Sequence, residues 1–145
     1  MTQFVVERTW STFTTVGACD RALERTKEYC SQRHVFGKPL LANQYLGVHT
    51  CRAGRAGRHV ARLQRGDGRT PRRRRRHPRQ ATIAKLTAGR LVREVADTCL
   101  QYHGGMGYVE ENWPARFWRD NRLTAIGAGA DEVMLQVLAR LDGYM

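Results

Sequence analysis

Three glycines within four positions are the feature that most constrains how this chain folds. They lie in the stretch Gln101-Tyr-His-Gly-Gly-Met-Gly-Tyr108, directly after a run with helical periodicity. Glycine adopts positive φ without steric cost and leaves the backbone bare, so another molecule can approach the main chain where such a helix ends. An isolated run of this kind is most simply a helix stop. The segments on either side decide between these two interpretations.

The sequence before this turn predicts one long helix and the start of a second. Residues 7–33 carry apolar or small residues at steps of three and four, which is one face of a 3.6-residue period. That face consists of Phe13, Val16, Cys19, Leu23, Thr26 and Cys30. Gly37 and Pro39 end the helix and turn the chain, and a second helix starts near Leu40.

A helical pattern resumes at Gln80 and continues beyond the glycines. Its stripe consists of Ala84, Ala88, Leu91, Val92, Val95, Cys99 and Tyr102, with Lys85, Arg90, Arg93 and Glu94 outside it. Asn112 or Trp113 caps a short helix with Pro114 in its first turn. We expect Phe117 and Trp118 in the core. Asp131 opens a last helix whose inward face we expect at Val133, Met134, Val137, Leu138 and Leu141. The predicted fold is all-α, an antiparallel four-helix-bundle-like domain.

The positive charge of the chain is concentrated in one segment, residues 50–79. Twelve of the 25 basic residues lie there, all arginine, with one of the 13 acidic residues, Asp67, so the segment has a net charge of +11. The remaining 13 basic and 12 acidic residues give +1. The segment has no Phe, Trp or Tyr and few apolar residues, so we expect no stripe that could face a core.

We therefore expect the second helix to be disrupted and divide the chain into three parts. Residues 1–49 and 80–145 form the helical domain, and residues 50–79 are disordered or an out-of-frame reading of a GC-rich gene, entered near Thr50 and left near Arg79. The coding DNA tests the second idea, which fails if restoring one frame gives no apolar-patterned helix.

Composition excludes several classes of protein. The length suits one domain with a modest core. No apolar run approaches the ~20 residues of a membrane span, and no secretion signal is recognisable, so we expect a cytoplasmic protein and no membrane partner. The cysteines form no C-x-x-C pair, and we expect no metal site. Cys19, Cys30 and Cys99 fall on apolar faces, where reduced core cysteine is the expectation.

Four segments together resemble the C-terminal helical domain of the acyl-CoA dehydrogenases. They are Gln32-Arg-His-Val-Phe-Gly-Lys38, the Gln101–Tyr108 stretch, Trp113-Pro-Ala-Arg-Phe-Trp-Arg-Asp120 and Ile126-Gly-Ala-Gly-Ala-Asp-Glu132. They occur in the family's order and at near-family separations, and the resemblance covers residues 3–49 and 80–143. It implies α,β-dehydrogenation of an acyl-CoA thioester with FAD as cofactor. A complete enzyme has two further domains, so we expect this chain to be a fragment that is inactive alone.

The resemblance also implies the catalytic and substrate residues. In the best-known branch the base is a glutamate at the position of Ala128, which cannot accept a proton. The isovaleryl-CoA and long-chain branch uses a glutamate on the first helix instead, which corresponds to Glu7. By resemblance Glu7 is the base, and Arg8, Ala128 and Gly129 contact the acyl-CoA. Taken alone, Glu7 is an acid favoured by the first turn of a helix.

A second set of residues matches family contacts with FAD. These residues are Arg33, Phe36, Gln44, Gln101, Gly104, Gly105, Ala130, Asp131 and Glu132. Arg33 and Phe36 match positions that contact the dinucleotide of a neighbouring subunit, where a guanidinium suits the pyrophosphate oxygens. Ala130 lacks the hydroxyl usual in the family. Taken alone, Arg33 and Gln101 are solvated helix residues. We interpret His103 as a packing or capping residue.

The resemblance implies three partners: acyl-CoA, an electron-transfer flavoprotein or similar acceptor, and further copies of the chain in a dimer or tetramer. Two alternatives stay open. One is a helical module whose arginine-rich arm binds nucleic acid, which we do not favour because the arm lacks aromatic residues to stack bases and has no repeated RGG pattern. The other is a non-catalytic oligomerisation bundle.

Overall fold

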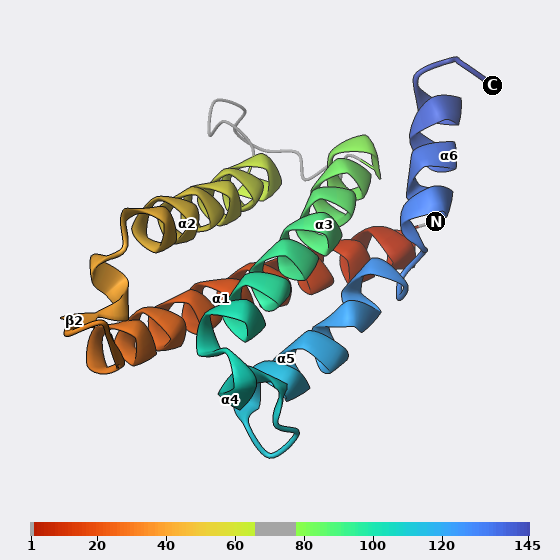
Figure 1. Ribbon diagram of the computed structural model, residues 1–145. Helices are drawn as coiled ribbons and strands as arrows, with labels where there is room; N and C mark the ends of the chain where they lie inside the picture. The colour runs from red at the N-terminus through yellow and green to blue at the C-terminus, as the bar shows by residue number, and fades with distance from the viewer. Residues whose placement is uncertain (1, 66–77) are drawn as a thin grey trace.

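The computed structural model describes residues 2–65 and 78–145, which are predominantly helical (Figure 1). In chain order the elements are α1 (Thr2–Gln32), β1 (His34–Val35), β2 (Lys38–Pro39), α2 (Gln44–Arg65), α3 (Pro78–His103), α4 (Gly105–Tyr108), α5 (Trp113–Arg122) and α6 (Asp131–Leu141). Single 3₁₀ turns at Leu40–Ala42 and Leu123–Ala125 precede α2 and follow α5. The predicted all-α class is confirmed.

Contacts between helices show in which direction each helix of the bundle runs. Near the start of both helices, Arg8 Nη1 of α1 donates to Thr82 Oγ1 of α3 at 3.1 Å. Near the end of both, Tyr29 Oη donates to the carbonyl of His103 at 3.4 Å. Helices α1 and α3 are therefore parallel and pack directly on each other, and α2 lies beside both and runs in the opposite direction (Figure 1). Helix α5 starts beside the end of α3 and runs back, as expected for an antiparallel bundle.

The core lies between α1, α2 and α3, with α5 packed against it. It is built from Val16, Cys19, Ala22, Leu23, Ala53, Val60, Ala88, Leu91, Val92, Val95 and Cys99. Most of the predicted α1 and α3 stripes are thus buried, although Phe13 is exposed and Tyr102 only half-buried. Cys19, Cys30 and Cys99 are buried free thiols, as predicted.

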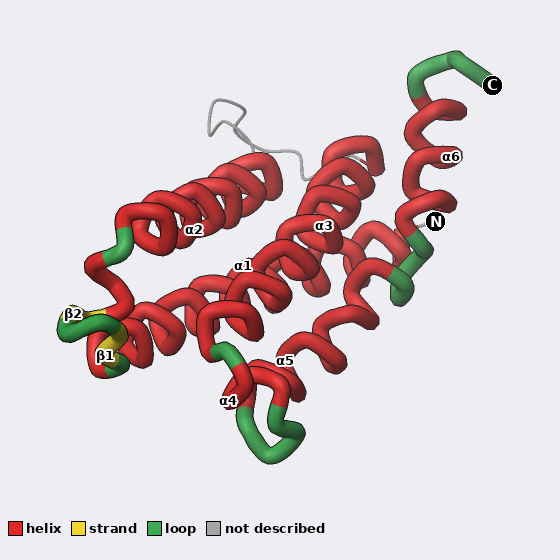
Figure 2. Tube along the Cα trace, in the orientation of Figure 1, coloured by secondary structure: helices red, strands yellow, loops and turns green. Residues whose placement is uncertain are grey.

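A two-residue hairpin separates α1 from α2. His34 pairs with Pro39 and Val35 with Lys38, so only Phe36 and Gly37 form the turn (Figure 2). Their φ angles are +53° and +77°, the pattern of a type I′ turn. Gly37 adopts this conformation without cost, whereas Phe36 is strained there. The Phe36 side chain is fully exposed, so the hairpin presents an aromatic ring to its surroundings.

The expected disruption of the second helix is wrong for residues 50–65. Helix α2 continues to Arg65, and Ala53, Gly57 and Val60 continue the buried face that begins at Leu46. The apolar stripe was missed because its members are small. Small residues let α2 approach closely: a Cβ on Gly57 would already touch Leu91 at 3.7 Å. The rest of the expected disordered or out-of-frame segment, residues 66–77, lies outside the described residues.

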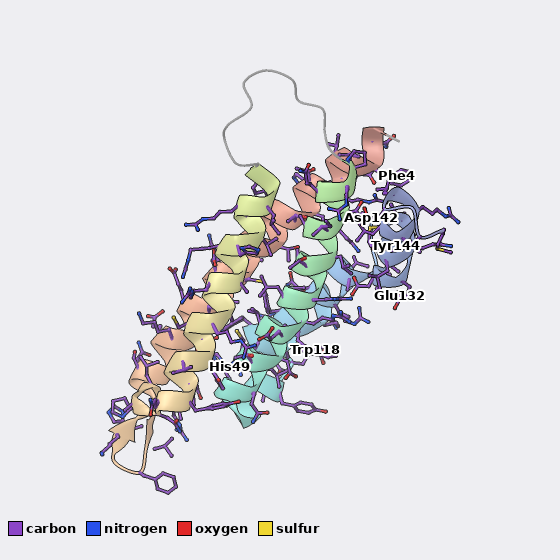
Figure 3. The ribbon with its side chains drawn as sticks, turned by 90° about the horizontal axis from the view of Figure 1, so that it is seen from above. Phe4, His49, Trp118, Glu132, Asp142 and Tyr144 are labelled. Atoms are coloured by element: carbon purple, nitrogen blue, oxygen red, sulfur yellow. The ribbon has the colours of Figure 1, made fainter. Side chains whose placement is uncertain are left out.

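Three other packing predictions are corrected. Lys85, predicted outside the α3 stripe, is fully buried. Trp118 is 45% exposed rather than part of the core. Of the inward face predicted for α6 only Met134 is buried, because the helix packs against the start of α3 and leaves the bundle, so Val133 and Leu141 are about half exposed. Phe4 and Tyr144 lie at this same end of the molecule (Figure 3).

No described helix is long and apolar enough to cross a membrane.

Candidate active site

A cavity of about 620 Å³ lies between the first half of α1 and the segment from the end of α5 to the turn before α6. We call it the α1–α5 cavity. Its lining includes Glu7, Trp10, Thr14, Asp120, Thr124 and Ala128. The structure therefore brings the predicted base, Glu7, to the same cavity as Ala128, the position at which the best-known branch of the resembling family carries its glutamate.

The turn that closes this cavity has an unusual backbone. Ala128 has φ +56° and Gly129 has φ +109°. Alanine is strained at positive φ, so neighbouring contacts must hold the turn. Gly129 cannot be replaced without movement, because a Cβ there would collide with Cε of Met134.

Two cationic side chains hold the turn through its carbonyl groups. The Lys85 ammonium, fully buried on α3, donates to the carbonyl of Gly129. Arg8 Nε, on α1, donates to the carbonyl of Ala128 at 3.4 Å. Burial lowers the pKa of both groups, and the nearby carboxylates of Asp131 for Lys85 and Glu7 for Arg8 act in the opposite direction. The burial of Lys85 is not visible in the sequence pattern, because a lysine off the apolar stripe usually faces water.

Asp131 is tied into the same region from the start of α6. Its Oδ2 accepts from Arg93 Nη2 at 2.8 Å, and Asp131 is 9% exposed. Glu132, next to it, is exposed. Both acids lie in the first turn of α6, where the positive end of the helix dipole stabilises their negative charge. Ala130 is the N-cap residue of this helix.

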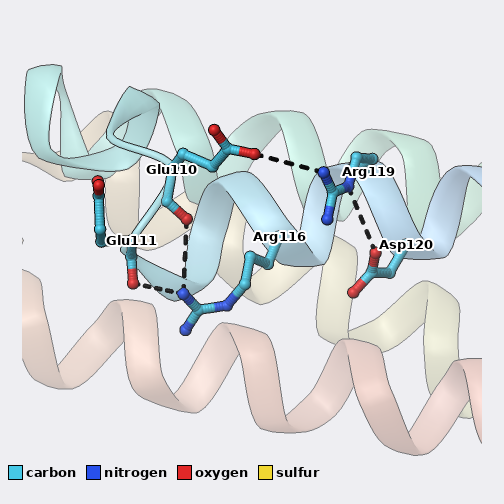
Figure 4. Close-up of polar contacts among 5 residues, drawn as sticks. All are labelled: Glu110, Glu111, Arg116, Arg119 and Asp120. Carbon is cyan, nitrogen blue, oxygen red and sulfur yellow. Dashed lines mark hydrogen bonds and ion pairs between the residues drawn. The ribbon is translucent and has the colours of Figure 1, made fainter.

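Asp120 is a second carboxylate in the cavity lining that sequence reasoning missed. It lies near the end of α5, where Arg119 Nε approaches its Oδ1 at 3.7 Å (Figure 4). Arg119 also donates to Glu110 at 3.4 Å, and Arg116 donates to the carbonyls of Glu110 and Glu111. These contacts connect the start of α5 and the preceding loop to the side of the cavity where Asp120 lies.

The other predicted cofactor residues gather at the opposite end of the bundle. Arg33, Phe36, Gln44, Gln101, Gly104 and Gly105 are all exposed there. The edge-to-face contact of His49 on α2 with Tyr102 on α3, 6.4 Å between centroids, holds the start of α2 against the end of α3. Around Gly104 and Gly105 no atom lies within 4 Å of an added Cβ, so the backbone is open to approach.

These two groups cannot serve one compact site on a single chain. Glu7 and Arg33 lie near opposite ends of α1, which at 1.5 Å per residue separates them by about 39 Å. The turn before α6 sits with Glu7, and the glycine turn sits with Arg33. The resemblance had assigned Arg33 and Phe36 to the dinucleotide of a neighbouring subunit, but the sequence carries no measure of their separation from Glu7.

His103 is enclosed by aromatic rings at the end of α3. Tyr29 stacks on it with centroids 4.2 Å apart, and Trp113 meets it edge-on at 5.2 Å. Its Nδ1 lies 2.7 Å from the carbonyl of Cys99, and Arg25 lies over the Trp113 ring at 4.4 Å. Burial lowers the pKa of His103, the hydrogen bond to the Cys99 carbonyl acts in the opposite direction, and the nearby Arg25 charge adds a smaller lowering. The interpretation of His103 as a packing residue is confirmed.

The glycine turn itself differs from a plain helix stop. Gly104 has φ +58° and starts the short helix α4. Position 107 requires a glycine, because a Cβ there would collide with the carbonyl oxygen of Leu100. Gly104 and Gly105 are open on the outside, and Gly107 packs inward against α3.

The helical bundle, the hairpin after α1 and the strained turn beside Glu7 define a domain of one enzyme family. The C-terminal domain of acyl-CoA dehydrogenases matches residues 1–141. The chain belongs to the acyl-CoA dehydrogenase family, whose members are FAD-dependent oxidoreductases.

Individual relatives agree with this assignment. The chain is 33% identical to a probable acyl-CoA dehydrogenase, YdiO, of Escherichia coli over 97% of its own length and 37% of that protein. The structure matches butyryl-CoA dehydrogenase of Megasphaera elsdenii with a TM-score of 0.85 at 28% identity, covering 97% of this chain and 37% of that one. It also matches a glutaryl-CoA dehydrogenase of Mycobacterium smegmatis in complex with FADH2, with a TM-score of 0.78 at 27% identity, covering 94% and 36%. The chain thus spans little more than a third of these proteins.

Proposed function

We propose that this chain is the C-terminal part of a flavin-dependent acyl-CoA dehydrogenase in which Glu7 is the catalytic base. The observation that carries the proposal is that Glu7 and Ala128 line one cavity. The reaction removes a proton from the carbon next to the thioester, and FAD, when bound, takes up the hydride from the next carbon. Ala128 has no acid–base group, so the glutamate opposite must perform the proton transfer.

Asp120 competes with Glu7 for this role because it lines the same cavity. We assign the base to Glu7 because the family resemblance selects that position, whereas Asp120 forms an exposed ion pair with Arg119 at 3.7 Å. The only side-chain hydrogen bond to Glu7 among the described residues comes from Gln3 at 3.3 Å, on the same helix. Its carboxylate is thus the freer of the two to accept a proton from a substrate.

Arg8 has a different role from direct contact with acyl-CoA. Its guanidinium donates hydrogen bonds to the carbonyl of Ala128 and to the hydroxyl of Thr82. It therefore acts on the substrate by holding the turn, in which Ala128 lines the cavity and Gly129 is the next residue. Asp131 likewise acts through its ion pair with Arg93, and Ala130 and Glu132 remain as the cofactor-facing part of the turn.

The exposed group at the far end of the bundle fits the adenosine diphosphate half of an FAD held by another copy of the chain. Arg33 offers a guanidinium for the pyrophosphate, and the open backbone at Gly104 and Gly105 admits a flat ring. Phe36 and Gln44 flank this surface. The separation from Glu7 by about 39 Å requires a second subunit, so the enzyme is a dimer or tetramer. The electrons then pass to an electron-transfer flavoprotein or similar acceptor.

A hybrid enzyme tests the proposal. Residues 1–141 would replace the matching domain of the 33% identical Escherichia coli relative. We expect the purified hybrid to hold FAD and to oxidise members of an acyl-CoA panel with a dye acceptor. A folded hybrid that binds no flavin contradicts the cofactor assignment, and one that binds flavin without any substrate-dependent bleaching contradicts the active-site assignment.

A further inference from the structure

The outward face of α2 carries a row of arginines. Its exposed residues between positions 52 and 62 are Arg52, Arg55, Ala56, Arg58, His59 and Arg62, and they alternate with the buried Ala53, Gly57 and Val60. Helix α2 contains no aspartate or glutamate along its length. We propose that Arg52, Arg55 and Arg62, which we call the arginine face, bind the phosphate backbone of double-helical nucleic acid.

The spacing of these residues suits a rigid line of charges. At 1.5 Å per residue, Arg52 and Arg62 lie about 15 Å apart along the helix axis, and at 3.6 residues per turn the three residues fall within an arc of about 80°. Duplex DNA carries one charge per about 1.7 Å of its axis, so a face of this length spans several phosphates. Guanidinium groups pair with phosphate oxygens through two parallel hydrogen bonds.

The arginine face has no carboxylate partner within the described part of the chain. The ion pairs there involve Arg79, Arg93 and Arg119. Arg58 differs from the other arginines of α2. Burial raises the pKa of Asp20 on α1, and the positive charge of Arg58 acts in the opposite direction. Arg58 Nη1 lies 3.7 Å from a Cβ added at Gly54, which also faces Leu23 of α1. This makes Arg58 a control within the same helix.

The chemistry of the face favours a duplex over other polyanions. Between positions 52 and 62 it exposes no Phe, Trp or Tyr, and the single imidazole of His59 does not form a series of rings on which successive unpaired bases could stack. The apolar side of α2 is packed in the core through Ala53 and Val60, so it is not available to insert into a lipid surface. Phosphate contact without base contact implies binding that is independent of sequence.

The arginine face is distinct from the arginine-rich arm that the sequence predicts. That arm was expected to be disordered, whereas the arginine face is part of a helix packed on α1 and α3. No residue of α2 lines the α1–α5 cavity, so the face stands independently of the proposed dehydrogenase activity.

The test measures binding of the full chain to a short labelled DNA duplex by fluorescence anisotropy at several salt concentrations. To remove the contribution of the neighbouring arginine run, the starting protein carries Arg→Gln at positions 69 and 72–76. With three phosphate contacts, the logarithm of the binding constant should fall against the logarithm of salt concentration with a slope of about −2.7. Affinity should therefore drop about 40-fold between about 50 and 200 mM salt.

Three variants of this protein decide the proposal. R52Q/R55Q/R62Q should abolish the salt-dependent binding, and R52K/R55K/R62K should keep its salt slope, because lysine keeps the positive charge that displaces counterions from the phosphates. R58Q and the charge-matched R90Q/R122Q/R140Q, on other exposed faces, should leave the slope within one contact, about 0.9, of the starting value. Circular dichroism checks that each variant is folded.

Several results would overturn the proposal. They are loss of binding already in the starting protein, an equal loss in the matched triple variant, and preference for single-stranded over duplex DNA. Binding to phosphatidylglycerol vesicles with none to the duplex would instead identify a membrane surface and equally overturn it.

Discussion

Glu7 on α1 and Ala128 in the turn before α6 line one cavity although 120 residues separate them in the chain. A carboxylate at either position would project toward the same space. The two positions that the family resemblance offers for a base therefore border one cavity. The predictions below test this site and the fold that holds it.

We expect Lys85→Met to destabilise the domain by about 1–3 kcal/mol. The substitution keeps the buried volume but leaves the carbonyl of Gly129 without its donor. Urea unfolding measures the change. Arg90→Met, at an exposed position of the same helix, serves as control and should lie within about 0.5 kcal/mol of the original. A Lys85→Met protein as stable as the original would mean that burying the charge costs as much as its hydrogen bond contributes.

Stability should fall as the pH is lowered through the usual His value of 6.5, because of His103. Burial between Tyr29 and Trp113 lowers its pKa in the folded state, so the unfolded chain takes up the proton first. The contribution of His103 is complete above its unfolded pKa and is lost below it.

Urea unfolding at a series of pH values checks the His103 prediction. His103→Phe should flatten the acid limb of the stability curve, whereas His59→Gln, at an exposed position, should leave it unchanged. An acid limb that His103→Phe does not alter would assign the effect to other groups.

Val60→Ala should destabilise the domain by about 1.5–3 kcal/mol. Val60 is 1% exposed and packs in the core from α2, so the change removes buried methyl groups and leaves a cavity. Leu63→Ala, at an exposed position one turn later, should cost much less. Equal and negligible effects of both changes would show that residues 50–65 do not form the packed helix in solution.

The 145-residue chain purified by itself should retain no flavin and oxidise no acyl-CoA. It spans about 37% of the length of the Escherichia coli relative, and its two groups of predicted cofactor residues lie at opposite ends of α1. Displacement of reacting groups by even ~1 Å can cost ~100-fold in rate. An absorbance spectrum with a flavin band, or dye reduction with any acyl-CoA, would contradict this expectation.

Much of the fold could be predicted from the sequence because the apolar periodicity of α1 and α3 is strong and the glycine turns are distinct. The continuation of α2 could not, because Ala53 and Gly57 pack by being small and carry no apolar signal of their own. The burial of Lys85 was also invisible, since its hydrogen bond to Gly129 depends on a turn 44 residues away.

The sequence selected candidate site residues but carried no information about their arrangement. The resemblance selected Glu7 and Ala128, which the structure brings together at one cavity. It also selected Arg8 for substrate contact, whereas the structure directs that side chain to the turn. Asp120 was missed because an aspartate after an arginine on an exposed helix is ordinarily a solvated residue.

The most direct test of the central claim moves the base across the cavity. In the hybrid enzyme, anaerobic mixing with acyl-CoA should bleach the flavin, and Glu7→Gln should slow this step by about 10²–10⁴-fold. The double variant Glu7→Gln with Ala128→Glu should recover a large part of the lost rate, because both positions line the same cavity. If Glu7→Gln bleaches the flavin at the original rate, Glu7 is not the base and the account is contradicted.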